Sequence, residues 1–239
     1  MRTFAFLTCW LVLCPAPRAG GQTTNDAAAY LAIISSPAGA LPPILSSPML
    51  NRSVRDLSVA IRYGHLPVDG NNVNTLDGRL LIPASPNVVV GVNAGYQNVS
   101  CKTNVCNGHV IGGANVEGRL ANLMLGSTAD AARVTIGLDG EAGFGLRSGL
   151  TAFSLTGGVP VALVSGPPSV RIAPFIAPGI GLGRVSGNGD AVNGTRFMLG
   201  GGVVFQSMRT GVGASVGFQK AFIENGDTML GVTLTLGAK

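Results

Sequence analysis

The 239-residue chain has little charge, few aromatic side chains and no long apolar run beyond its first 21 residues. Charged residues make up 11% of the chain, whereas an average soluble domain has about 25%. Apolar residues make up 46%, which argues against a disordered chain, because such chains combine high charge with low hydrophobicity. Past residue 21 the longest apolar run is Ala27 to Ile34, which is too short for a membrane-spanning helix of about 20 residues. The composition is therefore membrane-like, but the local pattern is not that of membrane-spanning helices.

The first 21 residues have the features of a secretory signal peptide. Arg2 is followed by an apolar core from Phe4 to Cys14, and residues 19–21 (Ala-Gly-Gly) provide small side chains for cleavage. A lipoprotein signal at Cys14 is a weaker alternative, because the bulky Leu13 precedes it where a small residue is expected. The apolar core is also too short for a retained anchor helix. We therefore expect residues 1–21 to direct export and then to be removed.

Export leaves two cysteines and a nearly balanced charge. Cys101 and Cys106 form a short C-x4-C pair, which in an oxidising compartment predicts a disulfide worth about 2 kcal/mol. Two thiols with no neighbouring His or Cys are a poor ligand set, so we expect neither a metal nor a cofactor. Without Arg2 and Arg18 the chain keeps 14 basic and 11 acidic residues. This small, scattered excess argues against a nucleic-acid partner.

The mature chain divides into two regions. Residues 22–52 are rich in Ala, Ser and Pro and are interpreted as a linker, tether or plug. Over residues 53–239 apolar side chains alternate with small or polar ones, and this period of two predicts strands. The pattern predicts ten of them, near residues 54–64, 78–84, 88–97, 110–123, 132–146, 150–164, 169–184, 195–206, 210–222 and 228–237.

The connections between these segments are expected to alternate in length. Long segments rich in Asn, Asp and Gly are 65–77, 98–109, 185–194 and 223–227, and short ones are 85–87, 165–168 and 207–209. Two connections are exceptions: 124–131 is longer than a tight turn, and 147–149 is short on the otherwise long side. Long loops at one end and short turns at the other are typical of outer-membrane barrels. Pro160, Pro174 and Pro178 interrupt the expected ladder, so they predict bulges, partly irregular strands or a barrel of only eight strands.

The two faces of the predicted strands decide the fold class. A soluble sandwich turns its charged face to water, but here the second face is mostly Gly, Ala, Ser and Thr, and Lys220 is the only lysine on a predicted strand. A glycine-rich face fits a crowded interior, and the apolar face would then contact lipid. A closed barrel also pairs every backbone donor in lipid. The sequence therefore predicts an all-β, antiparallel up-and-down transmembrane β-barrel of eight to ten strands, with ten the best count. The rival interpretation is a secreted soluble β-protein.

Residues 53–239 resemble the small bacterial outer-membrane β-barrel proteins of the outer-membrane protein A and opacity-protein type. The family ends in an insertion signal, Gly-x-x-apolar-x-aromatic, and Gly231, Leu234 and Leu236 occupy these places, with leucine in place of the final aromatic. The resemblance implies a location in the bacterial outer membrane, contact with its lipid and insertion by the barrel-assembly machinery. It also implies a structural or surface-interaction role, or a narrow pore.

Charged side chains on the small or polar face are the candidate functional residues. Buried charges must pair, because an unpaired one is strongly destabilising. The expected lumen charge network consists of Arg62, Glu117, Arg119, Asp139, Glu141, Arg171 and Arg196; Asp56 and Arg133 share the same face. We interpret these residues as ion pairs that close the lumen. The alternative is the selective lining of a pore, which usually has an excess of one sign.

Other residues give weaker signals. His65 and His109 are expected in loops, where His65 could act with Asp69, Asp77 or Ser100 in an outer-membrane hydrolase or acyltransferase, but a solvated loop histidine is the more common case. We therefore predict no enzymatic activity and no catalytic residues. An extracellular ligand could bind the loops. Candidate contact residues there are Asp69, Asn71, Asn72, Lys102, Asn104 and His109.

Overall fold

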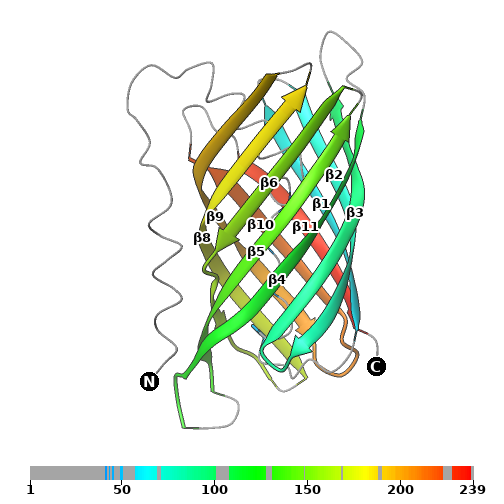
Figure 1. Cartoon of the computed structure of the whole chain (residues 1–239). Coiled ribbons are helices and arrows are strands. Elements are labelled where there is room, and N and C mark those ends of the chain that lie inside the picture. Colours follow the sequence, from blue (N-terminus) through cyan, green and yellow to red (C-terminus); the bar gives the residue numbers. More distant parts are fainter. Residues whose placement is uncertain are drawn as a thin grey trace.

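The computed structural model describes residues 41, 43, 45, 49–50, 57–68, 71–100, 108–127, 131–147, 149–167, 169–187, 190–222 and 228–237. The regular elements in this part of the chain are strands (Figure 1). They are β1 Ser58–Val68, β2 Asn71–Ser85, β3 Val88–Ser100, β4 His109–Met124, β5 Arg133–Arg147, β6 Leu150–Gly158, β7 Val161–Val164, β8 Val170–Gly187, β9 Asp190–Ser207, β10 Gly213–Ala221 and β11 Thr228–Gly237. Among these residues, no helix is long and apolar enough to cross a membrane.

The strands form one closed antiparallel barrel. Strands that are neighbours in the sequence pair with each other, except for β6 and β7, and the pairing of β1 with β11 completes the ring. β6 and β7 both lie between β5 and β8, so they are two parts of one strand. The barrel thus has ten strand positions. The predicted fold class and the best strand count are confirmed, and the alternative of eight strands is wrong.

Pro160, Pro174 and Pro178 lie around a single irregularity, the break between β6 and β7. Pro160 stands between β6 and β7, where its carbonyl accepts a hydrogen bond from Gly137 N (2.9 Å). The Pro178 carbonyl accepts one from Val159 N (2.9 Å), so this residue faces the gap between β6 and β7. Backbone groups alternate sides along a strand, so Pro174, four residues earlier, faces the same neighbour. The positions where Pro174 and Pro178 lack an N–H therefore face the gap between β6 and β7, where the β-ladder is already interrupted.

The expected difference in loop length between the two ends is wrong. β1 and β2 continue through most of 65–77, and only residues 69–70 separate them; likewise only 188–189 separate β8 from β9. Connections of five or more residues occur at both ends of the barrel. The reason is that the ladder uses backbone groups, so segments rich in Asn and Gly can continue it as well as apolar ones.

The apolar face of the barrel points outward. Leu138, Ile176 and Leu234 are 37%, 56% and 45% exposed, and along β8 exposed and buried residues alternate over most of the strand. These three side chains therefore lie on the outside of the barrel. In a soluble β-protein they would instead be enclosed in the core. The inward positions hold small residues, polar residues and a limited set of larger side chains.

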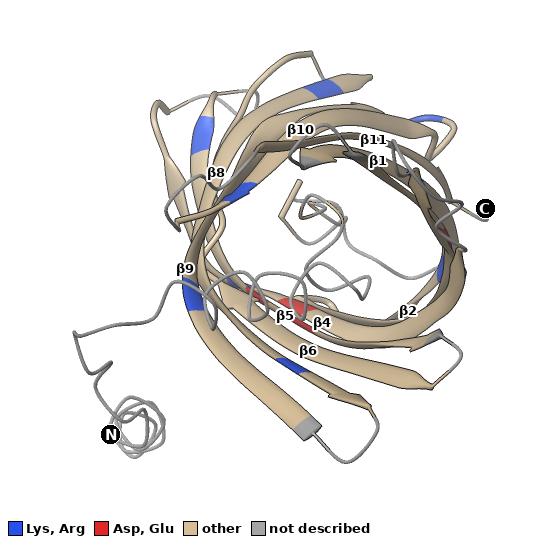
Figure 2. Ribbon diagram, turned by 90° about the horizontal axis from the view of Figure 1, so that it is seen from above, with Lys and Arg blue, Asp and Glu red and all other residues tan. Residues whose placement is uncertain are grey.

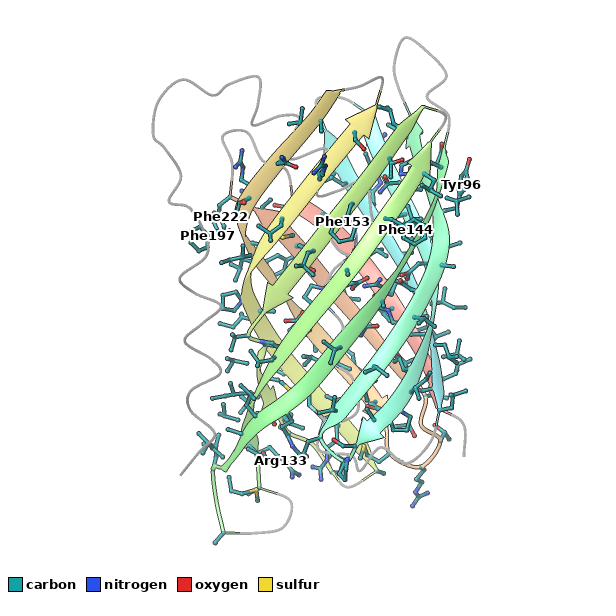
Figure 3. All side chains as sticks on the ribbon, viewed as in Figure 1. Tyr96, Arg133, Phe144, Phe153, Phe197 and Phe222 are labelled. Atoms are coloured by element: carbon teal, nitrogen blue, oxygen red, sulfur yellow. The ribbon has the colours of Figure 1, made fainter. Side chains whose placement is uncertain are left out.

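Aromatic side chains gather at one level of this outer surface. Tyr96, Phe144, Phe153, Phe197 and Phe222 are all exposed and lie at similar heights, toward the end of the barrel opposite the start of β1 and the end of β11 (Figure 3). Arg133 lies at the opposite end (Figure 3). A belt of aromatic rings at one height is typical of the boundary between hydrocarbon and water around a membrane barrel.

Candidate functional site: the barrel lumen

The lumen contains a cluster of charged side chains from β1, β2, β3 and β5. Arg62 on β1 pairs in register with Asp77 on β2, and Arg79 on β2 pairs in register with Asn93 on β3. Glu141 comes from β5, on the far side of β4. Inward positions on the intervening wall include Gly91, Gly95 and Gly113, which leave room for long side chains to lie across it. We call Arg62, Asp77, Arg79, Asn93 and Glu141 the ion-pair cluster.

Arg62 lies at the centre of the ion-pair cluster. Its Nε and Nη2 donate to the Asp77 carboxylate at 2.9 and 2.5 Å, while Nη1 and Nη2 donate to Glu141 at 3.3 and 2.9 Å. Arg79 Nη2 donates to Glu141 Oε1 at 2.6 Å. Asn93 Nδ2 lies 2.9 Å from oxygens of both carboxylates. Two guanidinium groups, two carboxylates and one amide thus form a network with no net charge.

The ion-pair cluster is almost completely enclosed. The side chains of Arg62 and Asp77 are 1% and 0% exposed, and the most exposed charged member, Glu141, is 12% exposed. In such surroundings each charge depends on its partners, because water cannot replace them. The cluster therefore fixes β1, β2, β3 and β5 relative to one another and fills their side of the lumen.

The structure brings together only part of the sequence-predicted network. Arg62 and Glu141 meet in the ion-pair cluster. Glu117 is buried on β4 opposite Asp139 of β5, and Oδ1 of Asp139 has no hydrogen-bond partner among the described residues. The remaining three residues lie near the barrel ends. Arg119 donates to Asn87 Oδ1, Arg171 to the Gly166 carbonyl and Arg196 to the Thr195 carbonyl.

Three members of the ion-pair cluster, Asn93 and the charged residues Asp77 and Arg79, are missing from the lumen network predicted from the sequence. Asp77 was assigned to a loop, and Arg79 was omitted from the lumen face. A usable signal was present, because Leu76, Leu80 and Ile82 mark the outward face of β2 and place both charges on the other face. Following the alternation into the segment rich in Asn would have found them.

A separate apolar group lies in the lumen toward the end of the barrel opposite the start of β1 and the end of β11. Leu66, Val73, Met198, Ala221 and Met229 form one buried cluster, and Val99 packs against it. Four of them lie within three residues of the ends of β1, β2, β10 and β11. The ion-pair cluster therefore has apolar side chains between it and this mouth of the barrel.

Described residues of the N-terminal region lie inside the barrel. Looking down the axis, this part of the chain is surrounded by the ring of strands (Figure 2). Leu41, Leu45, Met49 and Leu50 are at most 3% exposed. Three of them pack on side chains of β7, β8 and β9: Ala162, Val164, Ala173, Phe175, Ala177 and Val204. We call residues 41–50 the lumen segment, of which 41, 43, 45, 49 and 50 are described.

Among the described residues considered for an enzyme, His65 and Asp77 lie on opposite faces of the barrel wall. His65 points outward, and its Nδ1 and the Tyr63 hydroxyl both contact Asn74 Oδ1 at 2.8 Å. Asp77 points into the lumen, on the other side of the barrel wall. His109 is 8% exposed, so its prediction as a surface contact is wrong. In the described chain, no three His, Cys, Asp or Glu side chains are placed to hold a metal ion.

The remaining predicted residues are only partly described. Asn71 and Asn72 belong to β2 instead of a loop. In β11, Leu234 and Leu236 are outward and exposed, while Gly231 is inward and pairs with Gly64 and Gly217. Their role as an insertion signal stays a prediction. The predicted signal peptide lies outside the described part of the chain. The same holds for Asp56, Asp69, Cys101, Lys102, Asn104 and Cys106.

Comparison of the sequence with family models and with curated proteins gives no match. Comparison of the structure finds other barrels. The transport unit of the autotransporter AIDA-I from Escherichia coli is 10% identical, with 90% of this chain and 98% of that chain covered and a TM-score of 0.38. The translocator domain of autotransporter NalP from Neisseria meningitidis is 13% identical (78% and 90% covered, TM-score 0.37). An outer membrane channel from Pseudomonas putida F1 is 11% identical (82% and 100% covered, TM-score 0.34).

Proposed function

We infer that this protein is an integral barrel of the bacterial outer membrane that is closed at rest and has a structural or surface-interaction role, without catalysis. The outward apolar face and the aromatic belt support contact with lipid. The end of the barrel where β1 begins and β11 ends would face the periplasm, because an exported chain reaches the membrane from that side. The terminal strand, through Gly231, Leu234 and Leu236, would be the part recognised by the barrel-assembly machinery, and the outer loops would offer the contacts for any extracellular ligand.

One observation carries the proposal of a closed lumen. Arg62, Arg79 and Glu141 join β1 and β2 to β5 along one side of the interior, with nearly complete burial. A selective pore usually has an excess of one charge along its lining, whereas the ion-pair cluster is neutral. The lumen segment fills much of the space opposite the cluster.

The proposal predicts a membrane-inserted protein without stable conductance. We expect extraction from cell envelopes only with detergent, and different gel mobilities for the unheated and boiled protein. In planar bilayers the full mature chain should show no long-lived large steps, while a general porin prepared in the same way gives steps. Extraction by salt alone would contradict the membrane assignment, and a stable conductance for each inserted molecule would contradict the closed lumen.

A further inference from the structure

The lumen wall is uneven, and its less crowded side carries the lumen segment. The ion-pair cluster occupies the side of β1, β2, β3 and β5. On β8 and β9 the inward positions include Gly179, Gly181, Gly200 and Gly202, which project no side chain into the lumen. Pro43 lies against Gly200, and Met49 lies against Gly137 on β5. The lumen segment therefore uses space that glycine leaves free.

At position 200, glycine is required by the contact with the lumen segment and not by packing within the barrel wall. A Cβ added at this position would lie 2.5 and 2.7 Å from Cγ and Cδ of Pro43, but its nearest atom in the wall would be the Phe218 carbonyl oxygen at 3.6 Å. The wall alone would accept alanine here without a clash. At Gly137, by contrast, an added Cβ would meet the Gly118 carbonyl oxygen at 2.8 Å as well as Met49 Sδ at 2.5 Å. Glycine at position 200 thus serves the contact with Pro43.

The fit between the lumen segment and the wall is close. A cavity of about 30 Å³ remains between Pro43, Asp139, Gly179 and Gln219. A second, of about 20 Å³, lies beside Leu45, Leu50 and Gln206. Each has room for little more than a water molecule. At these two places the described residues of the lumen segment leave little space between themselves and the wall.

The chemistry of the N-terminal region suits this groove. No charged residue occurs from Ala27 to Asn51, so nothing in this stretch competes with the neighbouring ion-pair cluster. The sequence of 41–50, LPPILSSPML, contains three prolines. Proline has no N–H to satisfy and favours an extended backbone with little freedom to lose on binding.

We propose that the glycine side of the lumen is a binding site for an uncharged, proline-containing peptide, and that the chain's own N-terminal region occupies it through Leu41, Pro43, Leu45, Met49 and Leu50. The site is selective for such a peptide because its wall offers apolar surface and glycine recesses. Occupancy closes the space left beside the ion-pair cluster, so release of the peptide opens a narrow pore. This inference rests on the proposed closed outer-membrane barrel.

The test releases the lumen segment from a barrel that has already folded. A protease site is placed within residues 52–55, the full mature chain is folded and inserted in bilayers, and the chain is then cut. We expect no conductance before cleavage, loss of the labelled N-terminal piece on washing, and conductance afterwards. A synthetic LPPILSSPML peptide should block it, whereas the same peptide with Leu45→Asp should bind roughly 30-fold more weakly, because a buried leucine contributes about 2 kcal/mol.

A matched pair of glycine variants locates the site. Gly200→Ala should weaken block by the peptide about tenfold or more, while Gly157→Ala should not change it, because the nearest atom to an added Cβ there is the Asp139 carbonyl oxygen at 3.8 Å. A peptide with Pro43→Gly removes the clash and should block the Gly200→Ala and unchanged barrels equally well.

Each alternative outcome is decisive. Three results would each overturn the peptide site. The N-terminal piece could stay bound after washing, the barrel could show no conductance after the piece has left, or the peptide could block the Gly200→Ala and Gly157→Ala barrels equally. A large conductance before cleavage would overturn the closed barrel itself, so the two failures can be distinguished.

Discussion

Glu141→Gln is expected to lower the free energy of unfolding of the barrel by about 3–5 kcal/mol, the range found when one partner of a buried ion pair is removed. The Glu141 carboxylate accepts hydrogen bonds from Arg62, Arg79 and Asn93. Glutamine keeps the size of the side chain but leaves two buried guanidinium groups with only Asp77 as a counter-charge. Urea titration of the folded protein in lipid vesicles, followed by gel mobility, measures the change.

Asp139→Asn is the control for this prediction. Asp139 is two residues from Glu141 and also faces the lumen, but its Oδ1 has no hydrogen-bond partner among the described residues. Its replacement should lower the free energy of unfolding by about 1 kcal/mol or less. Equal effects of the two substitutions would show that Glu141 is not specifically coupled to the arginines.

A double substitution separates pairing from simple loss of packing. Arg62→Met removes one guanidinium, and in the Glu141→Gln background it should be less harmful than alone, because the remaining charges are again balanced. Residues within one network commonly show coupling of about 0.5–3 kcal/mol. Strict additivity of the two changes in the free energy of unfolding would contradict the ion-pair cluster.

Ile176→Arg is expected to destabilise the barrel by about 2–4 kcal/mol in lipid, as arginine does on the lipid face near the bilayer midplane. Ile176 is 56% exposed and belongs to the outward face of β8. In hydrocarbon, the arginine would have to lose its water of hydration or distort the bilayer. On a strand exposed to water, the same substitution would be nearly neutral. Urea titration in vesicles measures the difference.

Leu182→Arg on the same face of β8 is the matched control. It lies two residues before the native, outward Arg184, close to the level where arginine is already accepted, so the expected change is about 0–1 kcal/mol. Equal effects at positions 176 and 182 would contradict the placement of a hydrocarbon layer around the middle of β8.

The sequence predicted the wall of the barrel better than its ends or its contents. Alternation locates strands because each side chain must choose between two environments, and this assigned Leu138, Ile176 and Leu234 to one face. Alternation does not mark where a strand stops, since the ladder is formed by backbone groups that polar and glycine-rich segments also provide. The hairpins at 69–70 and 188–189 were therefore expected as long loops, and Asp77 was expected outside the lumen.

The lumen contents depend on contacts between distant segments. Glu141 reaches Arg62 across 79 positions in the sequence, and no local pattern encodes that meeting. The lumen segment has neither a period of two nor a charge pattern, so its sequence allowed a linker, a tether or a plug. Its place follows from the recesses at Gly137 and Gly200, which exist only once the barrel has closed.

Single-tryptophan variants in bilayers of brominated lipid test most directly which face of the wall meets hydrocarbon. The only native tryptophan, Trp10, lies within residues 1–21, so a chain expressed without them has none. The account predicts strong quenching of fluorescence for Ile176→Trp and little for Phe175→Trp, because these neighbours point to opposite sides of β8. Equal quenching of the two, or stronger quenching at position 175, would contradict a barrel with its apolar face in lipid and its glycine-rich face inside.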